Sequence, residues 1–161
     1  MKKQGFTLIE LIIVIAVIAL LAAAVFVAVD PAKRIGQARD AQRWSDVTAV
    51  ADAIMKYVVD NNGTFATTTP LPTVDDYYLI AGYQVTGTTG TTCQNATIDG
   101  AGAAIRLDSL VPTYLPTMPT DPSFTSGAST QYYFMRNSAG RIKIGACEES
   151  DYATASIYVQ R

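Results

Sequence analysis

A single carboxylate, Glu10, lies at the start of a long apolar stretch, directly after a short basic leader, residues 1–5. The stretch from Leu11 to Val29 contains nineteen residues without a charge. A secretory signal peptide carries its small-residue cleavage site after the apolar region. Here the only cleavage-like junction, between Gly5 and Phe6, comes before it. Processing at this junction would therefore leave the apolar segment on the mature protein.

Glu10 needs a partner if the apolar segment spans a membrane. A carboxylate in the first turn of a membrane helix is costly when it lies deep in the hydrocarbon. No Lys or Arg occurs between Glu10 and Lys33, so the chain offers no nearby cation after it. Cleavage before Phe6 would create one, the α-amine of Phe6. Without cleavage, Glu10 would instead lie at the level of the headgroups.

The remaining residues give no indication of catalysis. The chain has no His, which removes the commonest general base and transition-metal ligand. It also has no nucleophile elbow, phosphate-binding Gly loop or metal-spaced Cys set. Oxygen-rich loops can hold Ca²⁺, but solvated loop acids are the preferred interpretation, so we expect no enzyme activity, no cofactor and no metal. The acidic groupings are Asp75-Asp76, Asp99, Asp121 and Glu148-Glu149-Ser150-Asp151.

The N-terminal residues Gly5, Phe6, Thr7, Leu8 and Glu10, with the apolar run after them, resemble the type IV pilin family. That family includes major and minor pilins and the pseudopilins of type II secretion. The resemblance implies cleavage by a prepilin peptidase between Gly5 and Phe6 and N-methylation of Phe6. It implies that the Phe6 amine pairs with Glu10 of a neighbouring subunit. It further implies a helical homopolymer built by an inner-membrane assembly platform and a cytoplasmic ATPase.

The apolar segment has the length of a membrane span. Nineteen residues of helix measure ~28 Å, against a hydrocarbon core of ~30 Å, and no Gly or Pro interrupts them. Lys2 and Lys3 predict that the N-terminal end stays in the cytoplasm, with the domain after Asp30 on the outer side. We therefore expect a precursor in the inner membrane, surrounded by lipid; the resemblance implies that it then enters an extracellular filament.

A second, amphipathic helical segment follows a break. Asp30-Pro31 interrupts the helical pattern and Gly36 weakens it again, which predicts a kink near residues 27–36. Apolar residues then recur at helical spacing until about Asp60, where Asn61-Asn62-Gly63 ends the helix. The apolar stripe contains Ile35, Ala38, Ala41, Val47, Ala51, Ile54 and Val58.

Two further side chains of this helix are predicted, one on the surface and one with two alternative positions. Arg43 is expected on another face than the stripe, in a surface pair with Asp46. Trp44 is either a core wedge against the head or a subunit contact, and the core is preferred.

The rest of the chain predicts a small head. Residues 64–100 are rich in Thr, Gly and Asn and are expected to be loop. The triplet Asn95-Ala96-Thr97 matches a glycosylation acceptor, but an unmodified loop is the preferred interpretation. Residues 105–110 form a short helix candidate. Four prolines between 110 and 122 exclude a helix interior and a central strand there. Three strands are then expected, at 131–136, 141–147 and 153–160.

Cys93 and Cys147, the only cysteines, are separated widely in the sequence. If the head is exported to an oxidising space, a disulfide between them is expected. The alternative is a pair of buried free thiols. A bond of this span would stabilise the head by ~4 kcal/mol in the chain-entropy model.

The sequence pattern predicts an α+β protein with a long N-terminal helix, apolar in its first half and amphipathic in its second, and a small antiparallel sheet. The resemblance implies the type IV pilin fold, in which the helix packs on that sheet. Its parts are a leader (1–5), a membrane and filament-core helix (6–29), an amphipathic half-helix (30–62) and a head (63–161). Without Lys2 and Lys3 the chain has ten basic and fourteen acidic residues, a net charge of −4, so no nucleic-acid site is expected.

The predicted function is that of a structural subunit of a type IV pilus, serving adhesion, motility or DNA uptake. The alternatives are a type II secretion pseudopilin or a minor competence pilin and, from another class, a single-pass anchored binding protein.

Overall fold

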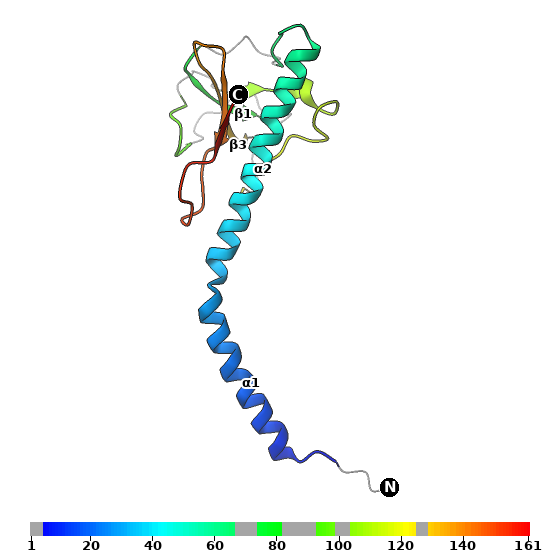
Figure 1. Ribbon diagram of the computed structural model, residues 1–161, viewed down its shortest axis with the longest axis vertical. Helices are drawn as coiled ribbons and strands as arrows, with labels where there is room; N and C mark the ends of the chain where they lie inside the picture. The colour runs from blue at the N-terminus through cyan, green and yellow to red at the C-terminus, as the bar shows by residue number, and fades with distance from the viewer. Residues whose placement is uncertain (1–4, 67–73, 82–92, 99–103, 125–128) are drawn as a thin grey trace. The chain divides into compact units, whose positions relative to one another are not determined.

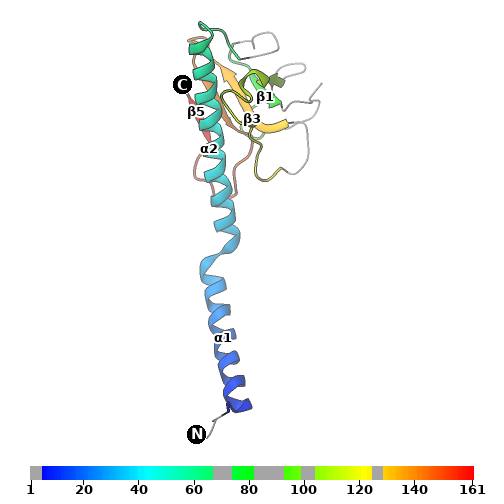
Figure 2. The ribbon, with the colours of Figure 1, turned by 90° about the vertical axis from the view of Figure 1, so that its right-hand side faces the viewer.

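A computed structural model describes the chain as two units, Met1–Ile35 and Gly36–Arg161. Figures 1 and 2 show their helices and strands in two views. The structure describes residues 5–66, 74–81, 93–98, 104–124 and 129–161.

Helix α1 spans Leu8–Val29, begins after the N-cap residue Thr7 and buries none of its residues. It contains no Gly or Pro, so its backbone hydrogen bonds continue without a break. Among the described residues it is the one helix that is long and apolar enough to cross a membrane, judged by length and composition.

Asp30 separates α1 from helix α2, which spans Pro31–Asp60. Its backbone lies in the left-handed region, at φ 45° and ψ 78°. Pro31 opens α2 at a position where a missing N–H costs little. The Oδ1 atom of Asp30 accepts the backbone N–H of Lys33 at 3.3 Å, so the same residue caps the second helix. The predicted interruption at Asp30-Pro31 is confirmed, whereas Gly36 continues the helix.

Within the second unit, α2 buries one stripe of side chains at three- and four-residue spacing. The helix ends at Asp60, as predicted. Asn62 and Gly63 have φ values of 52° and 85°, and the N–H of Gly63 donates to the carbonyl of Val58 at 2.8 Å. The fully buried apolar residues of the stripe are Val47, Val50, Ala51 and Ile54.

Two neighbouring side chains of α2 contradict the sequence analysis. Arg43, expected on the surface, is 2% exposed, and Trp44, expected in the core, is 44% exposed. The reason is helical geometry. Arg43 lies four residues before Val47 and therefore shares the buried face, while the next residue points about 100° away.

The head contains a five-stranded sheet with the order β2-β1-β3-β4-β5. Strands β1 and β2 pair in parallel; the pairs β1–β3, β3–β4 and β4–β5 are antiparallel. The strands are β1 Tyr77–Ala81, β2 Ala104–Arg106, β3 Ser129–Arg136, β4 Ile142–Ala146 and β5 Tyr158–Gln160, with a 3-10 helix at Asp108–Leu110.

The α+β class is confirmed, and the predicted C-terminal strands form β3, β4 and β5, although β5 covers only the end of its predicted range, 153–160. These three strands pair antiparallel as predicted, but the sheet as a whole is mixed because β1 and β2 pair in parallel. β1 lies inside the 64–100 stretch that was expected to be loop. Its last three residues are all buried, so the strand lacks the alternating pattern that reveals a half-exposed strand. β2 falls in the short helix candidate at 105–110, of which only Asp108–Leu110 is helical. The prolines do exclude helix and strand from 111–122.

Alternate residues of the strands divide the sheet into two apolar faces. Figure 2 shows α2 lying across one face, where Phe134 and Ile144 belong to the main core. On the other face, Leu79 and Tyr133 pack with Cys93, Ala96 and Cys147. The head is therefore a three-layer arrangement of helix, sheet and a short covering segment, 93–98.

Candidate functional site

The predicted processing junction lies outside helix α1. Gly5, Phe6 and Thr7 are non-helical and exposed, with the Phe6 side chain 88% exposed. Exposed backbone outside regular structure is readily accessible to a protease. Cleavage between Gly5 and Phe6 would leave both Thr7 and all of α1 on the product. Lys2 and Lys3 of the leader lie outside the described residues.

Glu10 is bound by Thr7 in a capping box. The Oε2 atom of Glu10 accepts the backbone N–H of Thr7 at 2.9 Å and its hydroxyl at 2.6 Å. In return, the N–H of Glu10 donates to Thr7 Oγ1 at 3.3 Å. Thr7 is thus a site residue that the sequence analysis missed, although Thr-x-x-Glu before an apolar run is the usual signal for this cap.

The capping box satisfies hydrogen bonds without neutralising charge. Among the described residues, no basic group lies within ion-pair distance of Glu10. A new amine at Phe6 would lie next to Thr7 in the chain. The geometry therefore brings the predicted junction and Glu10 together within one turn at the start of α1.

Helix α1 exposes apolar side chains all around its axis. Leu8 is 77% exposed, Leu20 75% and Val27 82%. A shallow groove on it is lined by Ile18, Leu21, Ala22, Val25 and Phe26. A helix that is apolar on every side is stable when lipid or other helices surround it.

The head contains a polar cluster that we call the Arg43 clasp, built around the buried residues Arg43 and Asp121. Its other members are the half-buried Asp40 and Ser150 and the exposed Ser123. Arg43 donates from Nε to Asp121 Oδ2 at 2.6 Å, from Nη2 to Asp121 Oδ1 at 3.0 Å and to Ser123 Oγ at 2.8 Å. Its Nη1 donates to Asp40 Oδ1 at 2.8 Å. Asp40 also accepts hydrogen bonds from the backbone N–H and the hydroxyl of Ser150. The clasp thereby ties α2 to the proline-rich segment and to the loop between β4 and β5.

The clasp changes the ionisation of its members. Burial opposes the charge of Arg43, but its hydrogen bonds to Asp121 and Asp40 outweigh this and raise its pKa. Burial likewise opposes the charge of Asp40, yet hydrogen bonds from Ser150 and Arg43 lower its pKa. One turn along α2, burial raises the pKa of Asp46, which accepts the hydroxyl of Tyr132 at 2.8 Å. The network as a whole favours a charged Arg43 and a charged Asp40.

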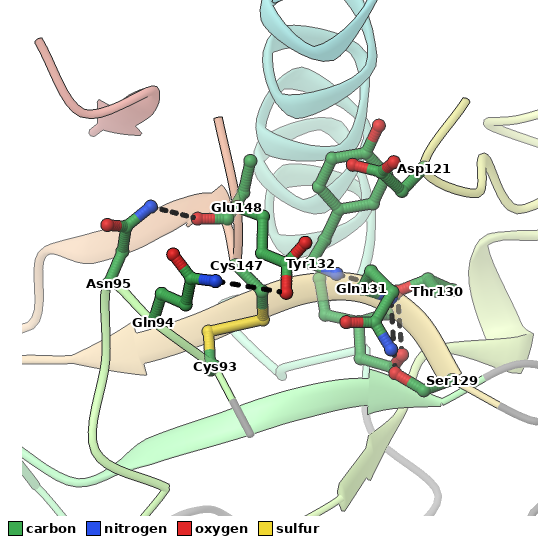
Figure 3. Close-up of a disulfide and its surroundings, with 12 residues drawn as sticks. Cys93, Gln94, Asn95, Asp121, Ser129, Thr130, Gln131, Tyr132, Cys147 and Glu148 are labelled. Atoms are coloured by element: carbon green, nitrogen blue, oxygen red, sulfur yellow. Dashed lines mark hydrogen bonds between the residues drawn. A yellow bond between two sulfur atoms is a disulfide. The ribbon is translucent and has the colours of Figure 1, made fainter. Parts of the chain in front are cut away.

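The predicted disulfide joins Cys93 to Cys147. It fixes segment 93–98 on the sheet face opposite α2, at the end of β4 (Figure 3). The backbone N–H groups of Gln94 and Asn95 donate to the carbonyl of Cys147 at 3.1 and 3.3 Å. The Gln94 side chain reaches Glu148 Oε1 at 3.5 Å. The disulfide therefore lies within a hydrogen-bonded attachment of the segment to the sheet.

The Asn95-Ala96-Thr97 triplet is part of this attachment. The Nδ2 group of Asn95 donates to the carbonyl of Ala146 at 3.1 Å, and Ala96 is buried in the second core cluster. Glycosylation acts on the same nitrogen, so the folded geometry favours an unmodified Asn95.

The acidic groupings of the sequence do not gather into one site. Asp121 belongs to the Arg43 clasp, and Glu149 accepts the backbone N–H of Ile157 at 2.9 Å. Asp99 lies outside the described residues. In the described part of the chain, no group of three or more His, Cys, Asp or Glu side chains is arranged to hold a metal ion.

Comparison with known families adds one match. Residues 1–26 match the model of the prokaryotic N-terminal methylation motif. Neither a curated protein nor a solved structure matches the chain at a significant level. The match covers the junction, the capping box and most of α1, and it leaves the head to be interpreted from its own structure.

Proposed function

We propose that this chain, a type IV pilin-like or pseudopilin protein by its N-terminal motif, is a structural subunit of a type IV pilus. The single observation that carries the proposal is the motif match on a helix whose apolar surface is entirely exposed. Such a motif points to a structural protein, to processing by a prepilin peptidase and to assembly in general. The pilus role, with adhesion, motility or DNA uptake as its use, is the finer proposal.

In the proposed mechanism the peptidase removes residues 1–5 and Phe6 becomes the N-methylated terminus. The positive Phe6 amine of one subunit then pairs with Glu10 of its neighbour. Such a pair neutralises two charges inside an apolar bundle and sets the axial register more than it adds net stability. Helix α1 exchanges lipid contacts for helix contacts, so helix packing supplies most of the driving force. The assembly platform and its ATPase supply the work of extraction.

The disulfide in the head supports export of this part of the mature protein from the cytoplasm. A disulfide within a small domain is typical of an oxidising compartment, and Cys93 and Cys147 are joined. This favours a surface filament.

A second candidate is a pseudopilin of type II secretion or a minor pilin. The observation that favours it is the proline-rich segment, which the Arg43 clasp docks on α2 as a compact part of the head.

The test is mass spectrometry of the N-terminus in two fractions, filaments sheared from cells and washed membranes. Methylated Phe6 in sheared filaments is the expected result. Methylated Phe6 found in membranes alone would favour the pseudopilin or minor subunit. An intact Met1 in both fractions would contradict the proposal and indicate a single-pass anchored binding protein.

A further inference from the structure

Two exposed cations follow directly on the apolar helix. Lys33 and Arg34 lie shortly after Val29, at the start of α2, and both side chains are exposed. With a rise of ~1.5 Å per residue, they lie ~6 and ~7.5 Å beyond the end of α1. The headgroup layer extends roughly 5–7.5 Å beyond the hydrocarbon core on each side. When α1 spans a bilayer, both charges are therefore at headgroup depth.

The described part of the protein supplies no counter-ion for these cations. No carboxylate there lies within ion-pair distance of Lys33 or Arg34. The Oδ1 atom of the nearest acid, Asp30, accepts the backbone N–H of Lys33. The carboxylate of Asp40 is occupied by Arg43 and Ser150. Both cations are thus available to an external anion.

Helix stability does not explain the position of these side chains. They lie in the first turn of α2, which contains no acidic residue. Cations in a first turn oppose the helix dipole, so this placement weakens α2. An anion held by Lys33 and Arg34 would offset that repulsion.

We propose that Lys33 and Arg34 bind the phosphate of an anionic phospholipid and fix the depth of the precursor in the membrane. An Arg guanidinium forms paired hydrogen bonds to phosphate, and a Lys adds a mobile point charge. Arg39 is also exposed, but it belongs to the second unit, further along the chain from the apolar helix, and so serves as the matched control. The proposal rests on the proposed function only in that α1 spans a bilayer; it does not require polymerisation.

The test measures lipid selectivity by electron paramagnetic resonance on the full-length precursor in phosphatidylcholine vesicles. Trace spin-labelled phosphatidylglycerol or phosphatidylcholine reports which lipid contacts the protein. The wild type should prefer phosphatidylglycerol by about fivefold for each of the two charges at low ionic strength. The double variant K33Q/R34Q should lose this preference, whereas the matched control R39Q should keep it. The variant K2Q/K3Q measures what the leader contributes.

Three results would overturn the proposal: no preference in the wild type, an equal loss in R39Q, or a preference that disappears entirely in K2Q/K3Q. Flotation of the vesicles separates this proposal from the proposed function. A precursor that does not float with the vesicles contradicts both. A precursor that selects phosphatidylglycerol through Lys33 and Arg34, but yields no filaments in cells, supports the lipid site and contradicts the pilus.

Discussion

Arg43 and Asp121 form a paired ionic contact across 78 positions of sequence, with Nε to Oδ2 at 2.6 Å and Nη2 to Oδ1 at 3.0 Å. Their side chains are 3% and 4% exposed. A guanidinium that donates two parallel hydrogen bonds to one carboxylate forms one of the strongest and most geometrically specific protein ion pairs. This contact connects the middle of α2 to the end of the proline-rich segment.

Replacing Arg43 by Met should destabilise the head strongly. Met fills much of the aliphatic volume but leaves the buried Asp121 and the half-buried Asp40 without their cation. Removal of one partner from a buried ion pair costs about 3–5 kcal/mol. We expect a loss of this size in the free energy of unfolding, measured by urea titration of the detergent-solubilised chain with circular dichroism.

The neighbouring cation Arg39 provides the matched control. It lies on the same helix one turn earlier and is exposed, so R39M should change the free energy of unfolding by less than about 0.5 kcal/mol. Equal losses for R43M and R39M would show that the clasp does not stabilise the head beyond a general effect of charge.

The contributions of Asp40 and Asp46 to stability should change in opposite directions as pH falls. Although burial opposes it, hydrogen bonding from Ser150 and Arg43 lowers the pKa of Asp40. A carboxyl with a lowered pKa in the folded state stabilises above its unfolded value of about 3.9 and loses that contribution as pH falls through the folded value. The stability difference between wild type and D40N should therefore be present at neutral pH and shrink below about pH 4.

Asp46 should behave in the opposite way. Burial, and then the charge of Asp121, raise its pKa against the effect of the Tyr132 hydrogen bond. A raised carboxyl pKa destabilises the folded state at pH values above it and ceases to do so in acid. D46N keeps an acceptor for Tyr132, so we expect it to be more stable than wild type at neutral pH and equal to it in acid. Urea midpoints measured across the pH range decide this, and a D46N loss at neutral pH would contradict it.

The disulfide should contribute most of its stability through segment 93–98. Cys93 and Cys147 are separated by 54 positions, for which the chain-entropy model gives about 4 kcal/mol. We expect C93A/C147A to lower the thermal midpoint and to expose residues 93–98 to limited proteolysis. A reductant should produce the same change in wild type and none in the double variant. Identical proteolysis of wild type and variant would show that hydrogen bonds alone hold the segment.

Gly145 on β4 should not tolerate a side chain. A Cβ there would overlap the Tyr133 ring and hydroxyl and approach the carbonyl of Ile157 to 2.8 Å. G145A should therefore cost about 1–3 kcal/mol as an overpacked site. In a Y133L background the cost should fall, because the ring is gone, and the double-mutant cycle measures this coupling. An unchanged cost in Y133L would place the whole clash at Ile157.

The elements of this fold could be predicted where the sequence changes its local chemistry. The apolar run, the Asp30-Pro31 break and the Asn-Gly end of α2 each act within a few residues. Of the C-terminal strands, β3 is rich in aromatic residues, and the last two alternate in sequence. β1 was missed because its end is buried on both faces and has no alternation. The register of α2 was predicted correctly for Val47 and Ile54, yet Arg43 was assigned by its charge rather than by its position.

The residues of the candidate site also differ in whether the local sequence reveals them. Gly5, Phe6 and Glu10 could be proposed as site residues because they lie close together in the chain. The partners of Arg43 could not, because Asp121 and Ser150 reach it from other parts of the sequence, and no local pattern records which acid meets which cation. The Thr-x-x-Glu pattern is a local signal for the capping role of Thr7. It was missed because Glu10 was interpreted only as an ion-pair partner.

The last prediction separates the two roles of Glu10, as helix cap and as charge. E10Q keeps an oxygen that accepts from Thr7 but removes the charge, whereas T7V keeps the charge and removes the hydroxyl contacts at 2.6 and 3.3 Å. Loss of an N-cap costs about 1 kcal/mol of helix stability, which a membrane-buried helix can lose and still form. If the Phe6 amine pairs with Glu10, sheared filaments should disappear in E10Q and persist in T7V, while methylated Phe6 is found in the membranes of both. Filaments from E10Q at the wild-type level would show that assembly does not require the charge of Glu10.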